Sequence, residues 1–286
     1  MTELGTRESP RADQVRRNPL PPARFRMPRW GSMLIGLILL GLAVSGLVRM
    51  EFSWARVMQG PSNIWDFLTG AFPPNLERAP NLAEAMFETL EMAILGTICG
   101  VILSISAAIL AAQNTTPFAP LGVAMRFVLS VLRSIPELVR ALIFVMAVGL
   151  GPLAGILAIT VDVLGFAGRF FAERIEEVER GPIDALRSTG ASGMAVVASA
   201  ILPSAFASFT GTSLFALEKA IRGATILGMV GAGGIGMELT PAFTLRQFDT
   251  ALTIILMILL VVFLAEQLSS LVRRKMLGAG QLQRAV

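Results

Sequence analysis

Three charged residues follow one another inside an apolar stretch of the chain, where a charge costs about 2.5–3.5 kcal/mol at the centre of a bilayer. They are Arg133, Glu137 and Arg140. An α-helix places residues at these intervals on one face, with the carboxylate between the two guanidinium groups. Two interpretations stay open: a mutually neutralising ladder that positions a helix, or a stripe with one uncompensated positive charge that lines a path for anions.

Four more charges lie in apolar stretches further along the chain. We expect Asp162 to pair with a positive group, either of this chain or of a second copy. Glu218 and Arg222 have the spacing of an intrahelical ion pair, which leaves Lys219 without a partner nearby in the sequence. Lys219 and Arg222 are expected near the outer membrane face, where they either meet an anionic solute or extend to lipid headgroups.

A glycine-rich run, residues 231–236, satisfies the pattern G-x-G-x-x-G. A dinucleotide-binding fold also requires a parallel sheet, which this sequence does not predict, so we reject that interpretation. Non-helical backbone inside a membrane must be buried or line a polar cavity. Gly231, Gly233 and Gly234 therefore either present N–H groups to an oxyanion or allow close packing between helices.

The elements that position these residues must lie in a membrane. The 286 residues are 54% hydrophobic and only 15% charged, and the mean hydropathy is +0.68. A soluble domain carries about 25% charged residues. The composition therefore indicates an integral membrane protein. We attribute the formal net charge of +4 to basic residues at the cytoplasmic ends of spans rather than to nucleic-acid binding.

The residue inventory excludes several kinds of chemistry. The chain has no histidine and one cysteine, Cys99, which excludes histidine-based proton transfer, the usual Cys/His zinc sites and an intrachain disulfide. The two lysines, Lys219 and Lys275, do not lie in a G-x-x-x-x-G-K-[ST] phosphate loop. We therefore expect no catalytic residue, metal or cofactor on this chain, and any energy from ATP must enter through another polypeptide.

Six apolar stretches have the length of about 20 residues that a membrane-spanning helix needs. They are residues 30–48, 88–112, 126–148, 152–172, 197–217 and 250–272. The first could instead be a signal peptide cleaved near Ala43, but its length and its long charged leader favour a retained helix. The predicted fold class is an all-α integral membrane protein with about six transmembrane helices.

The parts between the spans follow from charge. Residues 1–29, with five prolines and seven arginines, are expected to be a disordered cytoplasmic tail. Residues 49–87 are expected to form an external loop, and 88–275 the core of the protein. Because six crossings return the chain to its starting side, the basic cluster after residue 272 and the tail 276–286 are cytoplasmic, as is the loop 173–196.

The loop 173–196 has the composition of short helices bounded by glycines. Gly181 is expected to end a first helix, and Pro182 suits the first turn of a second. Gly190 suits the left-handed position after a helix, and Ser192 can cap the next one. A compact knob of this kind fits a groove on a soluble partner.

The same loop resembles the motif E-A-A-x-x-x-G, nine residues, I-x-L-P of permease subunits of binding-protein-dependent ABC importers. Asp184 replaces Glu, Leu186 replaces the second Ala and Ala200 replaces Ile, while the spacing from glycine to proline is intact. In that family the loop docks on the ATPase subunits. The resemblance therefore implies a coupling role for these residues: Asp184, Ala185, Leu186, Gly190, Leu202 and Pro203.

Three other segments, residues 133–139, 147–152 and 223–236, look like the phosphonate and phosphite branch of these permeases. The resemblance implies the methionine-permease-like fold of type I importers and an inner-membrane location. It also implies two copies of this chain, two ATPase subunits that bind ATP and Mg, an external binding protein, and phosphonate or a related phosphorus oxyanion as solute. The candidates for the translocation path are Arg133, Glu137, Arg140, Lys219, Arg222, Gly231, Gly233 and Gly234.

Two other classes of protein fit the sequence less well. An intramembrane hydrolase would need Ser213 and Lys219 as nucleophile and base, but their spacing places them about 120° apart around a helix. A stand-alone channel or ion-coupled anion carrier would need no ATPase. The absence of an internal duplication weighs against a carrier built from repeats within one chain.

Overall fold

The computed structural model describes residues 30–49 and 53–282, and these ranges contain helices and turns only. The chain divides into two compact units, residues 1–62 and 63–286. The first unit contains α1 (Trp30–Arg49) and the beginning of α2 (Trp54–Ala71). The expected cytoplasmic tail, residues 1–29, lies outside the described residues.

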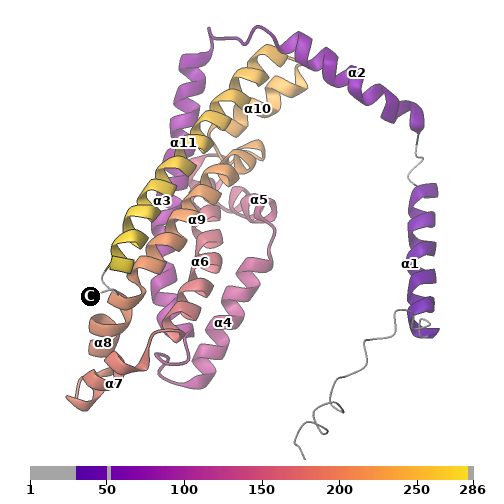
Figure 1. Cartoon of the computed structure of the whole chain (residues 1–286). Coiled ribbons are helices and arrows are strands. Elements are labelled where there is room, and N and C mark those ends of the chain that lie inside the picture. Colours follow the sequence, from indigo (N-terminus) through magenta and orange to yellow (C-terminus); the bar gives the residue numbers. More distant parts are fainter. Residues whose placement is uncertain (1–29, 50–52, 283–286) are drawn as a thin grey trace, which may run out of the picture. The chain divides into compact units, whose positions relative to one another are not determined.

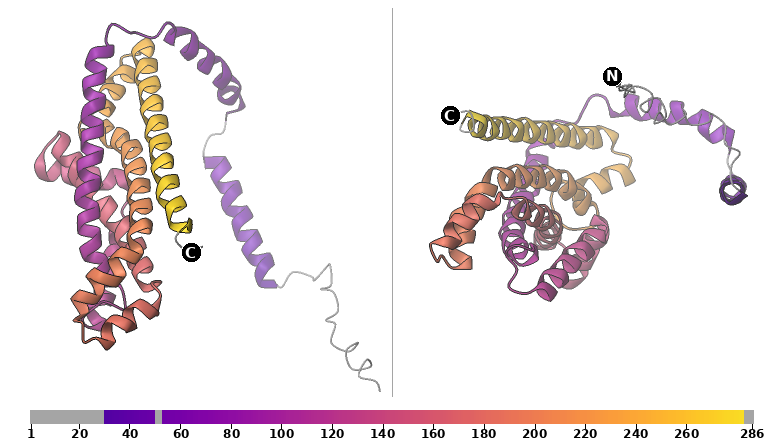
Figure 2. Two further views of the ribbon diagram at one scale, coloured as in Figure 1. Left: turned by 60° about the vertical axis from the view of Figure 1, so that its left-hand side comes forward. Right: turned by 60° about the horizontal axis from the view of Figure 1, so that its bottom comes forward.

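The second unit is a bundle of long helices that run side by side (Figures 1 and 2). Two short helices lie at one end of the bundle and α10 lies at the other (Figure 1). A five-residue π-helical stretch, η2 (Val197–Ile201), joins α8 to α9 directly before Pro203, whose missing N–H disturbs the regular ladder. The helices are α3 (Ala79–Ala111), α4 (Ala119–Ser134), α5 (Glu137–Val148), α6 (Pro152–Glu176), α7 (Arg180–Ser188), α8 (Gly193–Val196), α9 (Leu202–Met229), α10 (Ile235–Thr244) and α11 (Phe248–Leu282).

Five helical segments in the described ranges are long and apolar enough to cross a membrane: 30–49, 79–111, 152–176, 193–229 and 248–275. The third predicted span, 126–148, is wrong as a single helix, because α4 and α5 are separated at Ile135 and Pro136. Both residues have extended ψ angles, 122° and 142°. Proline lacks an N–H and disfavours helical geometry in the preceding residue, which accounts for the break.

Other predicted boundaries also move. The second span begins at Ala79 rather than 88, and α2 occupies part of the expected external loop. The fifth span continues past 217 to Met229, because Glu218 and Lys219, which would end an isolated apolar helix, form ion pairs within the bundle. Gly181 does not end a helix: α6 ends at Glu176 and Gly181 lies in the first turn of α7.

Small residues allow the two central helices, α3 and α6, to pack closely. A Cβ atom added to Gly100 would lie 2.6 Å from Cβ of Val163, and one added to Gly96 would lie 2.7 Å from Cβ of Ile159. The Ser104 hydroxyl donates to the carbonyl oxygen of Val163 at 3.2 Å. Such interfaces are typical of membrane proteins, where van der Waals packing and interhelical hydrogen bonds hold helices together.

We expect Gly100→Val to destabilise this interface. The added methyl groups would overlap Val163, and overpacking of this kind costs about 1–3 kcal/mol. The midpoint of thermal unfolding of the purified protein in detergent measures the effect. Gly211→Ala is the control, because a Cβ at Gly211 meets nothing within 4 Å. Equal midpoints for the two variants would contradict the packing argument.

Candidate translocation site and coupling loop

A single carboxylate joins three helices in the middle of the bundle. Asp162 of α6 forms an ion pair with Nη2 of Arg140 of α5. The Lys219 ammonium of α9 donates to both carboxylate oxygens of Asp162, at 2.7 and 2.9 Å. The expectation that Asp162 pairs with a positive group is therefore confirmed, and both partners belong to this chain. The partner of Lys219, which the sequence left open, is Asp162.

The two cations of this cluster differ in burial. The Arg140 side chain is 5% exposed and that of Lys219 is 36% exposed. Arg140 also donates from Nη1 to the carbonyl oxygen of Leu132 at 2.9 Å. The Lys219 ammonium lies 5.7 Å from the ring centroid of Phe166, within range of a cation–π interaction. The Arg140 guanidinium is thus fixed by two acceptors and almost fully buried, whereas part of the Lys219 side chain stays accessible.

The cluster lies at the depth of the hydrocarbon layer. Residues 92–112 of the chain carry no charged side chain and form most of α3. Gly100, near the centre of that stretch, packs on Val163, the neighbour of Asp162. An apolar stretch of about 20 residues spans the core of a bilayer, so the three charges lie well inside the membrane. The prediction that Lys219 lies near the outer face is wrong.

The predicted ladder of Arg133, Glu137 and Arg140 does not form on one helix. The break at Pro136 separates Arg133 from the other two residues. Arg133 is exposed at the end of α4, with its guanidinium 5.9 Å from the ring centroid of Phe170. Glu137 makes no ion pair within 4.0 Å among the described residues.

The Glu137 side chain instead lies against the backbone of α9. A Cβ atom added to Gly223 would overlap Oε1 of Glu137. Glycine at position 223 therefore makes room for this carboxylate between α5 and α9. The translocation candidates Glu137, Arg140 and Lys219 come together around Asp162, whereas Arg133 lies apart from their ion pairs.

The next charged pair on α9 also differs from the sequence expectation. Glu218 accepts a hydrogen bond from Nη2 of Arg273 of α11 at 3.0 Å, and Arg222 is exposed. The predicted Glu218–Arg222 pair is therefore wrong. Spacing within one helix could not reveal this, because the competing cation comes from a helix 55 residues further along the chain.

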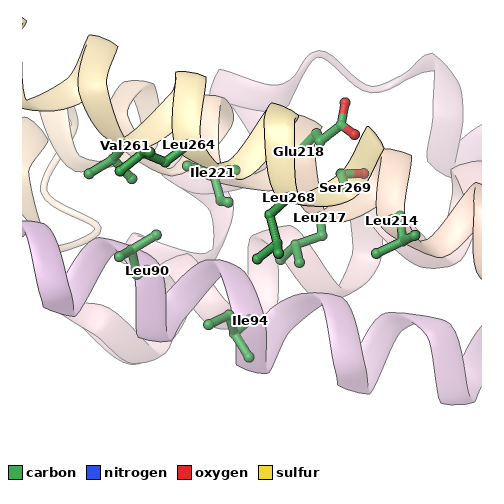
Figure 3. A pocket seen from close by; sticks show the side chains of 11 residues that line it. Leu90, Ile94, Leu214, Leu217, Glu218, Ile221, Val261, Leu264, Leu268 and Ser269 are labelled. Carbon is green, nitrogen blue, oxygen red and sulfur yellow. The ribbon is translucent and has the colours of Figure 1, made fainter. Parts of the chain in front are cut away.

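Glu218 also borders an apolar cavity of about 300 Å³ between α3, α9 and α11. Its carboxylate points away from the leucine side chains that face the space (Figure 3). An apolar lining cannot replace the hydration shell of an anion, so this cavity is a poor candidate for a path that conducts anions. The remaining lining residues are Leu90, Ile94, Leu214, Leu217, Ile221, Val261, Leu264, Ala265, Leu268 and Ser269.

The glycine run forms the turn between α9 and α10. Gly231, Gly233 and Gly234 have φ angles of 92°, 95° and 70°, which side chains rarely adopt. The carbonyl oxygen of Gly231 accepts from the N–H of Gly151 at 2.9 Å, and the N–H of Ile235 donates to Oγ1 of Thr89 at 2.8 Å.

The N–H groups of residues 231 and 232 also donate within this turn. Gly233 and Gly234 are buried, and an added Cβ at Gly233 would lie 3.0 Å from the backbone of Pro152. Of the two interpretations left open, the structure therefore favours close packing. It does not favour an N–H array for an oxyanion, since several of these groups are already bonded.

The second half of the loop 173–196, from the end of α7 to the start of α8, has the local geometry that its sequence predicts. Gly190 has a φ angle of +79°, which confirms the left-handed position after α7. The N–H of Ala191 donates to the carbonyl oxygen of Leu186 at 3.3 Å, as in a Schellman motif. The Ser192 hydroxyl accepts from the N–H of Ala195 at 3.3 Å, which confirms the expected cap of α8.

One face of α7 packs on the bundle and the other face is exposed. Ile183 is buried and Leu186 partly buried, whereas Asp184 and Ala185 are exposed. Further along the motif, Leu202 and Pro203 begin α9, and α7 contacts the η2 stretch that precedes them. The coupling candidates therefore form one continuous feature at the end of the bundle shown lowest in Figure 1.

The neighbouring turn between α3 and α4 is tied to the same end. Glu176 of α6 accepts from the N–H of Gln113 at 2.8 Å and pairs with Arg126 at 3.2 Å. Asn114 donates to the carbonyl oxygen of Ile175 at 2.8 Å. These bonds fix the end of α6 from which α7 departs, so a force on α7 would be transmitted to the bundle.

Comparison with known proteins finds one matching family and several similar transport permeases. The sequence profile of the binding-protein-dependent transport system inner membrane component matches residues 80–278. The phosphite transport system permease protein PtxC of Stutzerimonas stutzeri is 35% identical over 243 residues, 85% of this chain and 87% of its own length. The phosphate-import permease protein PhnE of Mycolicibacterium smegmatis is 34% identical over 271 residues, 92% of this chain and 49% of its own length.

Solved structures show the same fold. An inward-facing structure of the MetNI methionine ABC transporter matches with a TM-score of 0.63 at 21% identity, over 71% of this chain and 99% of that one. The predicted methionine-permease-like fold is thereby confirmed. Proteins of this kind are permease subunits whose ATPase is a separate polypeptide, not enzymes themselves. The chain belongs to the family of inner membrane components of binding-protein-dependent transport systems, as a permease subunit of an ABC importer.

Proposed function

We propose that this chain forms the translocation path of an ATP-driven importer for phosphonate, phosphite or phosphate. The relatives named for phosphite and phosphate transport support this solute class. One observation within the chain carries it furthest: two cations, Arg140 and Lys219, share the single carboxylate of Asp162 inside the membrane. Glu137 lies one turn before Arg140 on α5, so the cluster has two cations and two carboxylates. An anionic solute accounts for the retention of cationic donors where charge is costly.

Membership of the family supports an assembly of several subunits. Two copies of the chain form the path, and an external binding protein delivers the solute. Two ATPase subunits, which bind ATP and Mg, dock on residues 173–196 of the two copies. Both termini of the chain lie in the cytoplasm, because α4 and α5 together form the third of six crossings. ATP binding then favours one of two conformations of the path, and transport follows from the difference in solute contacts between the two.

The other classes of function find no support in the geometry. The Ser213 hydroxyl donates to the carbonyl oxygen of Phe209 at 2.8 Å, and Lys219 is bonded to Asp162. The nucleophile and base that a hydrolase would need therefore do not face each other. A stand-alone channel or carrier would leave the exposed coupling loop without a partner.

Uptake into proteoliposomes tests the proposal. The permease is reconstituted with its ATPase and its binding protein, and radiolabelled phosphite, methylphosphonate and phosphate are supplied in turn. We expect uptake of at least one of these anions, and only when ATP, ATPase and binding protein are all present. Uptake without the ATPase would instead indicate a carrier, and no uptake of any of the three would refute the solute class.

Arg133→Gln tests whether Arg133 contacts the solute, because its loss should reduce transport without unfolding the protein. Because Arg133 is exposed, its loss should change the free energy of unfolding by no more than about 0.5 kcal/mol. We expect uptake to fall about tenfold, the effect of one charge-assisted hydrogen bond. Arg274→Gln, at an exposed arginine near the end of α11, is the control. Unchanged uptake in Arg133→Gln would remove this residue from the path.

A further inference from the structure

We propose that Lys219 exchanges partners during transport. In the conformation described, its ammonium binds Asp162; as the solute passes, the ammonium leaves Asp162 and binds the phosphorus oxyanion. This inference rests on the proposed function and assigns a mobile solute-binding group within it. Arg140, by contrast, remains with Asp162 throughout the cycle.

The first argument is the number of charges. Asp162 carries one negative charge and has two cationic partners. When Lys219 leaves, Arg140 still neutralises the carboxylate, and Arg140 itself keeps its bond to the carbonyl oxygen of Leu132. Removal of one partner of a buried pair is costly because the other is left uncompensated. Here Asp162 keeps a cationic partner when Lys219 leaves, so the exchange avoids that cost for the carboxylate that Lys219 gives up.

The second argument is the difference in freedom between the two cations. Arg140 is almost fully enclosed, whereas about a third of the Lys219 side chain is accessible. A lysine ammonium is a point charge with three donors on a flexible stem, and it can follow a moving oxyanion. A guanidinium held by two fixed acceptors cannot do so without loss of both bonds.

The third argument is the position of Lys219 on α9. Ser204, Ser208, Phe215 and Arg222 recur at helical spacing with Lys219, and all five are exposed or partly exposed. They form a stripe along one side of α9, with two hydroxyl groups near the start of the helix, Phe215 in the middle and two cations beyond it. A hydrated anion that leaves Lys219 toward the start of the helix passes Phe215 and then meets the two hydroxyl groups on the same face.

Exchange also explains how the solute is released. The oxyanion replaces one anionic acceptor of the ammonium with another, so a charge-assisted bond is broken for each one formed. Asp162 remains nearby as a competitor, which limits the affinity for the solute. A site with an unpaired lysine would hold a phosphorus oxyanion more tightly and release it more slowly.

Substitution of the two lysines tests the exchange in the complete reconstituted importer. Lys219→Gln should lower the kcat/KM of phosphite and phosphate uptake at least tenfold, and Lys219→Arg should restore part of it. Lys275→Gln, the same change at the other lysine of the chain, should have no effect. If wild-type protein imports these anions and Lys219→Gln imports them equally well, the exchange is wrong while the proposed function stands. If the wild type imports none of phosphite, phosphate and methylphosphonate, the proposed function itself fails.

Chemical labelling gives a readout that a static ion pair would not change. In a Lys275→Arg variant, Lys219 is the remaining lysine. Its acylation by an amine-reactive reagent is followed by mass spectrometry in the nucleotide-free importer and in one held by a slowly hydrolysed ATP analogue. We expect faster acylation in one of the two states and suppression of that increase by phosphite. Equal rates in both states, insensitive to phosphite, would overturn the proposal.

Discussion

Asp162→Leu is expected to lower the free energy of unfolding by about 3–5 kcal/mol, the cost of an uncompensated buried charge. The variant leaves Arg140, whose side chain is 5% exposed, without a carboxylate partner in the described contacts. Lys219 loses its partner too, but its accessible face limits the cost there. The midpoint of thermal unfolding of the purified protein in detergent should fall clearly below that of the wild type.

Two further variants make this result specific. Asp66→Leu changes an exposed aspartate of α2 and should leave the midpoint close to that of the wild type. The double variant Arg140→Met with Asp162→Leu removes both charges of the buried pair and should recover much of the loss, because well-packed apolar side chains often replace such pairs without penalty. A double variant as unstable as Asp162→Leu alone would show that the cost lies in packing and not in the charge.

The charges of this site could be predicted from the sequence only in part. The cost of an intramembrane charge predicts that Asp162 has a partner. It does not say which, because the partners come from α5 and α9, 22 and 57 residues away. Spacing within one helix predicts Arg222 as the partner of Glu218, whereas in the structure Glu218 pairs with Arg273 of α11. Pairing between helices depends on how they pack, and this cannot be read from one helix alone.

The sequence contains a signal for two packing features that the span prediction does not include: the break at Pro136 and the close contact between α3 and α6. Pro136 lies in the middle of the third predicted span, and the apolar run around it favoured a continuous helix over the break that proline causes. Gly96 and Gly100 have the G-x-x-x-G spacing of close helix–helix contacts, which predicts the α3–α6 interface once the partner helix is known. In the loop 173–196 the left-handed Gly190 and the Ser192 cap were predicted correctly, because neighbours in sequence decide their conformation, whereas the helix end at Gly181 was not.

Gly190→Val is expected to abolish or strongly weaken capture of the ATPase by the permease. The left-handed conformation at Gly190, with a φ angle of +79°, costs a residue with a side chain about 1–2 kcal/mol, and more when Cβ is branched. The strain can be relieved if the end of α7 unwinds, which breaks the bond between Ala191 and Leu186 and displaces Asp184. Copurification of the ATPase with the permease measures the loss.

A matched change shows whether backbone conformation is the cause. Gly193→Val places the same side chain three residues further on, where φ is not positive and an added Cβ meets nothing within 4 Å. This variant should retain the ATPase, and both variants should reach the membrane in equal amounts, since neither position lies in the buried part of the bundle. Because only Gly190 is held in the left-handed region, loss of the ATPase in both variants would mean that bulk on this surface matters more than the helix end. Copurification of the ATPase with both variants would show that the ATPase does not dock on the loop 173–196.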